Sequence, residues 1–341
     1  MSSWWKYGVI VLLLIAAALV PQVLPTFWIS IATEVLIYGL LAMSVNFLGG
    51  YGGLVSLGHA GLFGVSAYTV GYLVTRMHAN HYLAFLAGIL LTLAVGAIFG
   101  GVAIRATGIY FLMITYAEGM VVWGLAYRWA KVTGAENGIR GITRPELFTK
   151  GWQYYYIVLV VFVLAVYLMW RVLNSSFGLT LRGIRECEPR MAALGYNVPM
   201  HKFLGYMWSA FFAGIAGGLY AYYNRFVSPS TVQLSVSSES VLMTVLGGVG
   251  TFFGPLLGSL IIIVGRNMIS LYTARWPIIM GTIFVLTVLL APKGIIGTLS
   301  AWWEQRKKVS AGVVEVETVE ASARKEVGAE GEIRVGTESQ F

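Results

Sequence analysis

The residues that could do chemistry are few, and most lie inside apolar stretches. Glu118 falls near the middle of an apolar run, and Glu34 and Arg266 fall toward the ends of two others. Burying one such charge in a bilayer raises the free energy of insertion by at least about 2.5 kcal/mol. We therefore expect Glu118 to face other helices, and the similar depth of Glu34 and Arg266 would allow an ion pair between them.

No group of residues has the spacing of a catalytic or metal centre. The four histidines have no helix-spaced partner for a metal, and no glycine-rich loop ends in the Lys-Ser or Lys-Thr of a phosphate site. The sequence therefore predicts that the chain is not an enzyme, needs no cofactor or metal, and does not itself hydrolyse ATP. An integral-membrane enzyme is disfavoured because no nucleophile–base pair is visible.

One polar segment, residues 174–202, has the pattern of ordered structure between two apolar runs. Pro189 suits the first position of a helix, because its missing N–H would have no partner there. Gly195 suits the position after the end, where a left-handed residue is favoured. Apolar residues recur at helix-like intervals along the segment: Phe177, Leu181, Ile184, Met191 and Leu194. We predict a short helix over 189–194, behind an amphipathic approach, that docks into a partner.

The elements that must position these residues are membrane helices. The chain of 341 residues is 57% hydrophobic and 11% charged, which is far outside the range of soluble proteins. A bilayer core about 30 Å thick needs roughly 20 apolar residues per helix. Ten candidate runs fall at 8–25, 29–48, 57–75, 82–104, 108–129, 152–173, 203–223, 238–249, 254–273 and 276–291. We predict an all-α fold, a polytopic integral membrane helical bundle of about ten transmembrane spans.

Basic residues beside the span ends predict the orientation. With ten spans, Lys6, Arg105, the group at 171–190 and the group at 306–308 fall on one side, which we expect to be cytoplasmic together with both termini. The loop 130–151 then faces outward although it carries four basic residues, against that rule. The net charge of +8 is dispersed over such loops. We therefore expect membrane lipid, and no nucleic acid, as a partner.

Two glycine-rich breaks, at residues 48–52 and 246–250, share a pattern. Non-helical backbone at membrane depth requires protein or a water-filled cavity around it, and interrupted segments in corresponding halves of a chain indicate a substrate path. Tight helix packing through small residues would give the same pattern. We predict broken or re-entrant segments here. The predicted path residues are Asn46, Gly50, Gly53, Ser56, His59, Glu118, Gly247 and Gly248.

Several stretches resemble the membrane permease subunits of bacterial ABC importers for branched-chain amino acids, in particular the second of the two paired permeases. In family order they are Gly50 to Tyr68, 107–115, 133–142, 177–198, 209–221, 241–259 and 291–297. The resemblance implies a heterodimer with a second homologous permease, two cytoplasmic ATP-binding subunits and a periplasmic substrate-binding protein. It also implies location in the bacterial inner membrane.

The resemblance further implies that residues 178–195 seat in a cleft of the ATPase. The positions that match the family pattern are Gly178, Arg182, Glu186, Glu188, Ala192 and Gly195. Cys187, the single cysteine, stands where the family usually has Asn, and Glu118 replaces a neutral polar residue, so the substrate preference could differ. The expected cargo is a branched-chain or related hydrophobic amino acid. Urea, short amides and aromatic acids stay open, as does an ion-coupled secondary transporter that uses Glu118.

The predicted domain organisation has two parts. Residues 1–305 form the transmembrane domain, in which 174–202 is the cytoplasmic coupling loop. Residues 306–341 are rich in Glu, Gly and Ser and predict a disordered, charged cytoplasmic tail.

Overall fold

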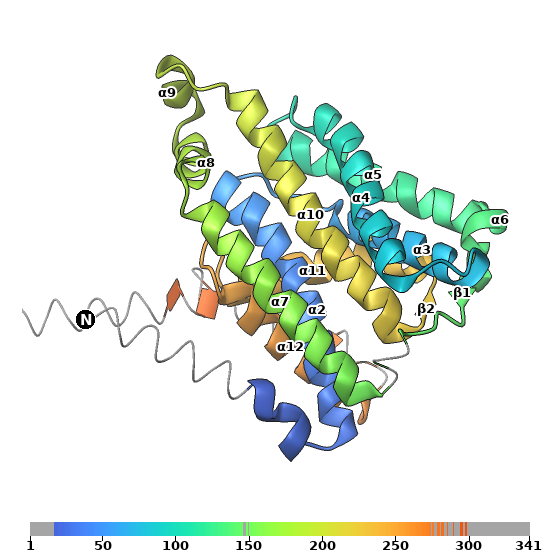
Figure 1. Ribbon diagram of the computed structural model, residues 1–341. Helices are drawn as coiled ribbons and strands as arrows, with labels where there is room; N and C mark the ends of the chain where they lie inside the picture. The colour runs from blue at the N-terminus through green and yellow to red at the C-terminus, as the bar shows by residue number, and fades with distance from the viewer. Residues whose placement is uncertain are drawn as a thin grey trace, which may run out of the picture.

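The computed structural model describes residues 17–145, 148, 150–273 and 275, with isolated positions between 278 and 298. These residues form helices almost throughout (Figure 1), so the predicted all-α bundle is confirmed. Parts of the expected first and tenth spans, and all of the tail 306–341, lie outside the described residues. The count of ten spans therefore stays a prediction.

The longer helices are α2 (Thr26–Asn46), which continues into the π-helical turn η1 (Phe47–Tyr51), α3 (His59–Arg76), α4 (His81–Ala103), α5 (Gly108–Arg128), α7 (Gly151–Leu173), α10 (Val198–Asn224), α11 (Leu234–Gly247) and α12 (Gly254–Ser270). The short elements are α6 (Ala130–Thr133), η2 (Ala135–Asn137), β1 (Ile139–Arg140), α8 (Ser176–Glu186), α9 (Glu188–Ala193), β2 (Phe226–Val227) and η4 (Pro229–Val232).

Among the described residues, five helices are long and apolar enough to cross a membrane: α2 with η1, α4, α5, α7 and α10. The apolar helices α11 and α12 have only 14 and 17 residues. A helix of 14 residues is about 21 Å long, which is less than a hydrocarbon core of about 30 Å. The second glycine-rich break joins these two short helices, as the prediction of broken segments requires. The first, at 48–52, was expected to break the helix but continues it as η1, and the non-helical backbone begins only after Gly52.

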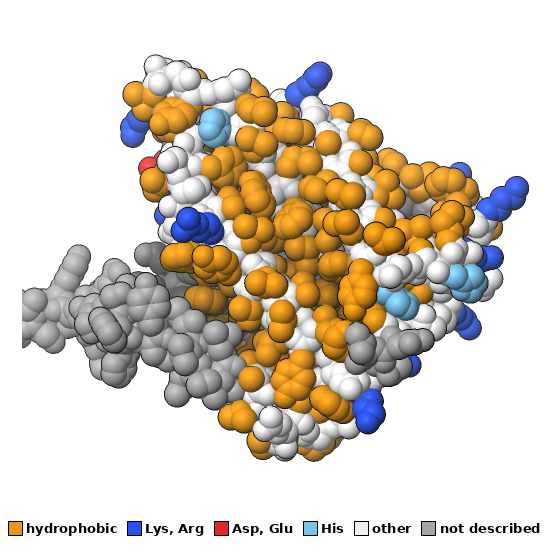
Figure 2. All heavy atoms as spheres, in the orientation of Figure 1, with side chains coloured by type: hydrophobic (Ala, Val, Ile, Leu, Met, Phe, Trp, Pro, Cys, Tyr) orange, Lys and Arg blue, Asp and Glu red, His pale blue; other side chains and the backbone are white. Residues whose placement is uncertain are grey.

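Helices α2 and α10 form the centre of the bundle. In the 18-residue apolar stretch of each helix, 83% of the residues are buried in α2 with η1 and 67% in α10, against 33% in α4 and in α5. Helix α10 packs against α2, α3 and α4. Large apolar side chains such as Leu90 on α4 and Leu164 on α7 are exposed, and Figure 2 shows a broad apolar face. This pattern indicates that the peripheral helices face lipid, while α2 and α10 face protein.

Close approach of α3 and α10 depends on a missing side chain. A Cβ atom at Gly217 would lie 2.0 Å from the carbonyl oxygen of Phe63. In lipid no hydrophobic force drives helices together, so packing through small residues supplies the attraction instead.

Short elements lie at the two ends of the bundle. At one end α8 and α9 project beyond α7 and α10 (Figure 1). At the other end β1 and β2 pair antiparallel, with Ile139 opposite Val227. We refer to these as the α8–α9 end and the β1–β2 end.

Candidate functional site

The two glycine-rich breaks touch each other near the α8–α9 end, where Asn46 joins them. The Asn46 Nδ2 donates to the carbonyl oxygen of Thr251 at 2.8 Å, and its Oδ1 accepts from the Gly250 N–H at 2.8 Å. Asn46 is only 2% exposed. Buried backbone groups outside a helix need partners. Asn46, at the end of α2, supplies those partners to the break between α11 and α12.

Gly50 allows this contact because it has no side chain. A Cβ atom there would lie 2.1 Å from the Asn46 Oδ1 and 2.7 Å from the Gly250 nitrogen. Gly250 also has a φ of +81°, in the left-handed region that glycine tolerates best. The two breaks, matched by pattern in the sequence, are therefore neighbours in space. Their role in a substrate path stays a prediction.

Gly247 and Gly248 are buried where α11 turns into α12. A Cβ atom at Gly247 would lie 1.8 Å from the carbonyl oxygen of Gly254, so the two backbones are in direct contact. Gly248 has a φ of +117°, and its carbonyl accepts from the Thr251 hydroxyl at 2.7 Å. Both predicted path residues thus shape the break itself.

Ser56 and His59 belong to a buried chain of hydrogen bonds that joins α2, α3 and α10. The His59 Nδ1 lies 3.1 Å from the Ser56 hydroxyl, and its Nε2 lies 2.6 Å from the Ser209 hydroxyl. The Ser209 hydroxyl donates to the carbonyl of Ser44 at 2.7 Å. Its proton is therefore used, so the His59 Nε2 must donate and Nδ1 must accept. His59 is fully buried, and in this conformation it ties helices together.

Glu118 lies on α5 and faces the bundle interior, as predicted. Its Oε2 accepts from the Tyr206 hydroxyl of α10 at 3.2 Å, and the residue is 8% exposed. Its Oε1 has no partner among the described residues. A Cβ atom at the neighbouring Gly119 would lie 3.6 Å from the Gly58 Cα, so this turn of α5 contacts the segment that holds Ser56 and His59.

The Glu34–Arg266 ion pair is present, and a third charge joins it. The Arg266 Nη2 lies 2.5 Å from Glu34 and its Nη1 lies 2.9 Å from Glu239. Asn267 also donates to Glu34, at 3.2 Å. The cluster links α2, α11 and α12, on the β1–β2 side of the breaks. Sequence reasoning missed Glu239, although its place in an apolar run at a depth near that of Arg266 could have indicated it.

The short helix predicted at 189–194 is present as α9, which spans Glu188–Ala193 and has Pro189 in its first turn; that it docks into a partner stays a prediction. Gly195 follows it with a φ of +86°. Glu188 forms an ion pair with Lys202 at 2.7 Å, so α9 is tied to the start of α10.

The other predicted docking residues lie on or beside α8. Gly178 is buried, and a Cβ atom there would lie 2.2 Å from the carbonyl oxygen of Leu173, so the turn from α7 into α8 is tight. The Arg182 guanidinium lies over the Tyr51 ring at 5.0 Å. Glu186 and Ala192 are exposed. Contact between these residues and an ATPase stays a prediction.

Sequence reasoning also missed Arg185, which connects α8 to both breaks. Its Nη1 donates to the carbonyl oxygen of Gly50. The same nitrogen would lie 3.2 Å from a Cβ atom at Gly250, and the Arg185 Cγ would lie 2.9 Å from one at Gly53. Arg185 follows the buried Leu181 by four residues, so its stem starts on the helix face that is turned toward the bundle, while the residue as a whole stays exposed. That spacing was the available signal.

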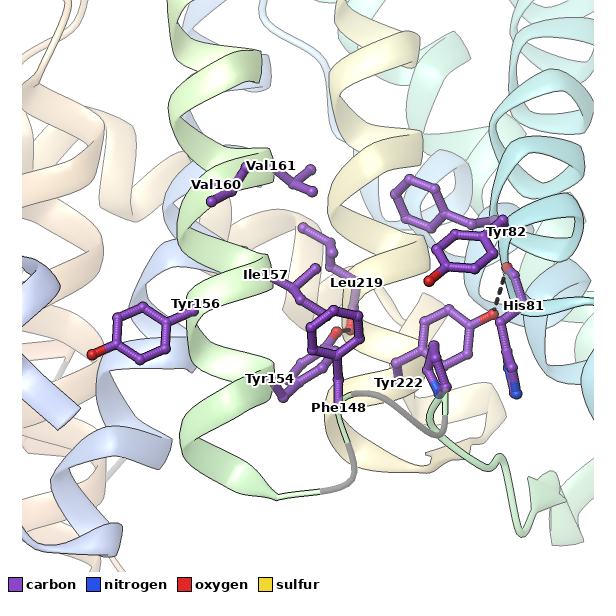
Figure 3. A pocket seen from close by; sticks show the side chains of 12 residues that line it. His81, Tyr82, Phe148, Tyr154, Tyr156, Ile157, Val160, Val161, Leu219 and Tyr222 are labelled. Atoms are coloured by element: carbon purple, nitrogen blue, oxygen red, sulfur yellow. Dashed lines mark hydrogen bonds between the residues drawn. The ribbon is translucent and has the colours of Figure 1, made fainter.

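A pocket of about 480 Å³ lies between α4, α7 and α10 toward the β1–β2 end (Figure 3). Its lining is aromatic and apolar. The Tyr154 hydroxyl donates to the carbonyl of Leu219 at 2.5 Å, and the Tyr222 hydroxyl donates to that of His81 at 3.0 Å. None of the predicted path residues lines this pocket.

Arg144, in the loop with unexpected basic residues, has a structural partner. It donates to the last carbonyls of α10, those of Tyr222 at 2.9 Å and Tyr223 at 3.0 Å. Cations at the C-terminus of a helix are favourable. Burial and the nearby Arg225 lower the pKa of the Arg144 guanidinium. One of the loop's four basic residues thus caps a helix, while Lys131, Arg140 and Lys150 are exposed.

The known proteins that this chain resembles are branched-chain amino acid transport permeases. The family model described as "Branched-chain amino acid transport system / permease component" matches residues 27–291. The high-affinity branched-chain amino acid transport system permease protein LivM of Escherichia coli K12 is 29% identical, over 84% of this chain and 74% of its own length. The corresponding LivH protein of Salmonella typhimurium is 21% identical, over 76% of this chain and 91% of its own. No solved structure matches the chain.

Proposed function

Because the chain belongs to the family of branched-chain amino acid transport permease components, we propose that it is a permease subunit of an ATP-binding-cassette importer. It carries branched-chain or related hydrophobic amino acids across the bacterial inner membrane, with both termini in the cytoplasm. It pairs with a second, homologous permease. Two cytoplasmic ATPases drive it, and a periplasmic binding protein delivers the cargo. The similarity to both LivM and LivH supports the permease pair.

The observation that carries this proposal is the exposed α8–α9 pair. Leu194 is 67% exposed and Tyr196 is 45% exposed, beside the charged residues Glu186 and Arg190. Exposed apolar side chains rimmed by polar ones mark an interaction site. A linker in water would not need a capped helix with such a tip, whereas a helix that enters a cleft of a partner does.

In this mechanism the ATPase pair moves α8 and α9 relative to the bundle. ATP binding closes the ATPase dimer, and its closed form holds the α8–α9 pair differently from its open form. A ligand can shift a conformational equilibrium only by its differential affinity for the two states. The sequence has no glycine-rich phosphate loop that ends in Lys-Ser or Lys-Thr, so in this proposal the driving free energy enters through the contact with the ATPases.

The test measures how well the chain co-purifies the ATPase subunits when a charge is placed at Leu194, directly after α9. We expect Leu194→Asp to reduce co-purification of the ATPases by at least about tenfold, as loss of a central apolar anchor does at other interfaces. Met77→Asp is the matched control, because Met77 is 60% exposed at the opposite end of the bundle. ATP-driven leucine uptake into proteoliposomes should fall in parallel with capture. Equal capture by both variants would contradict the proposal.

The orphaned Glu118 oxygen favours one alternative, an ion-coupled transporter that works alone. A buried carboxyl with an unpartnered oxygen could carry a proton across the bundle. Uptake into liposomes that hold only this chain, without nucleotide and abolished by Glu118→Gln, would establish that alternative. A panel of leucine, urea, short amides and aromatic acids, presented to the complete transporter, identifies the cargo.

A further inference from the structure

The Arg185 side chain lies across the place where the two breaks meet. Its guanidinium donates to the carbonyl oxygen of Gly50 in the first break and lies against Gly250 in the second. Its stem crosses Gly53. A hydrogen bond from a charged donor is roughly twice as strong as a neutral one. One side chain of α8 therefore bonds to the first break and contacts the second.

Asn46 also binds at this junction. It binds the Gly250 N–H and the Thr251 carbonyl, while Arg185 binds the Gly50 carbonyl. Asn46 belongs to α2 and is buried, so it moves with the bundle. Arg185 belongs to α8, outside the bundle. The junction of the two breaks thus has one internal tie and one tie to the projecting helix.

Helix α8 is itself connected to α9, at the tip. The Met191 sulfur of α9 lies 2.8 Å from the position of a Cβ atom at Gly183. Leu181, which is fully buried, packs against Gly52 of the first break and Gly205 of α10. A displacement of α9 therefore pulls on the helix that carries Arg185.

We propose that Arg185 is a latch: it is a positioning residue that keeps the two breaks together while α8 occupies this position and releases them when α8 moves. The latch is a property of this chain alone. Only the statement that ATPase subunits move α8 rests on the proposed function. The latch adds to that function a specific residue through which movement at the tip reaches the glycine-rich breaks.

Hydrogen exchange of the full chain in lipid nanodiscs tests the latch. Arg185→Met keeps an apolar stem over Gly53 but removes the donor. We expect amide exchange in residues 47–58 and 246–253 to become about tenfold faster, as for loss of one charged hydrogen bond that closes a local opening. Arg185→Lys keeps a charged donor and should restore most of the protection.

Two controls separate the latch from general loosening of the fold. Arg171→Met removes an exposed arginine from the same end of the bundle and should leave exchange at both breaks unchanged. Exchange in residues 209–221, at the centre of α10, should be the same in every variant. Unchanged exchange at the breaks in Arg185→Met, or equally fast exchange throughout the chain, would overturn the proposal.

The assembled transporter gives a second readout. Arg185→Met should raise the number of ATP molecules hydrolysed per amino acid imported, because movement of α8 no longer reaches the breaks. An unchanged ratio would count against the latch. A wild-type assembly without ATP-driven uptake would instead refute the proposed function, and the exchange experiment would still decide whether Arg185 holds the breaks.

Discussion

Replacing Arg266 should destabilise the bundle far more than replacing Glu239, although each change removes one member of the same cluster. With all three groups ionised, Glu34, Glu239 and Arg266 carry a net charge of −1, by formal counting (−1 −1 +1). Glu239→Gln leaves one neutral ion pair. Arg266→Gln leaves two carboxylates without a cation among apolar helices.

The magnitudes follow from the burial of the cluster. Removing one partner of a buried ion pair costs about 3–5 kcal/mol, because the remaining charge is left uncompensated. These side chains are 17–20% exposed, and the nearby water reduces that cost. We therefore expect Arg266→Gln to lower the free energy of unfolding by about 2–4 kcal/mol. Glu239→Gln removes one ion pair, but it also removes the excess negative charge of the cluster. We therefore expect it to lower the free energy of unfolding by only about 0–1 kcal/mol.

The assay is equilibrium unfolding of the purified chain in one detergent at fixed pH and salt. The double variant Arg266→Gln/Glu34→Gln should be more stable than Arg266→Gln alone, because it removes one of the two stranded carboxylates. With Glu34→Gln measured as well, the four proteins form a double-mutant cycle that isolates the interaction between the two sites. Equal losses for Arg266→Gln and Glu239→Gln would refute the charge argument.

Two further predictions concern the breaks and the β1–β2 end. Gly50→Ala places a Cβ atom 2.1 Å from the Asn46 Oδ1, so the breaks must separate; we expect a loss of transport, whereas Gly101→Ala, with no atom within 4 Å, should keep it. Figure 2 shows basic side chains at the β1–β2 end; the exposed ones include Arg76, Arg128, Lys131, Arg140 and Lys150. We therefore expect the KM for loaded binding protein to rise with salt, because screening weakens steering of an acidic partner; a KM independent of salt would contradict this.

The elements that the sequence predicted best are those with local signals. Pro189 and Gly195 mark the ends of α9 within one residue, because a missing N–H and a left-handed φ are properties of single residues. The long apolar runs 82–104, 108–129 and 152–173 likewise predicted α4, α5 and α7. Helix α11, expected at 238–249, in fact begins at Leu234, because polar serines in its first turns hide it from hydropathy.

The contacts that the sequence could not predict are those between distant segments. Arg185 reaches Gly50, which is 135 residues earlier, and Arg266 reaches Glu34, which is 232 residues earlier. Depth in the membrane predicted the second contact, since both residues lie in apolar helices. Depth could not predict the first, because α8 lies outside the bundle and its rotation depends on packing against Gly52.

His59 illustrates a different limit. A histidine near a glycine-rich break fits a substrate path and fits helix packing equally well from sequence alone. The structure surrounds it with two hydroxyl partners and leaves it unexposed. The distinction required the positions of Ser56 and Ser209, which lie on opposite sides of the ring and 153 residues apart by number (209 − 56).

Helix α2 is tied to α11 and α12 at several depths, since the carbonyls of Ala42 and Val35 accept from Thr244 and Ser259 between the contacts of Asn46 and Glu34. Among these ties, Arg185 of α8 contacts the one at Asn46. Near one end Asn46 holds the break at 250–251, and three turns away Glu34 holds Arg266 of α12. Arg185 touches the first tie and not the second. Pulling α8 therefore loosens one end of the contact between α2 and the α11–α12 pair, while the Glu34–Arg266–Glu239 cluster keeps the other end closed. The expected motion is a rotation about that cluster, so Arg266→Gln should increase hydrogen exchange along the whole α2–α12 contact, whereas Arg185→Met should increase it only at the breaks.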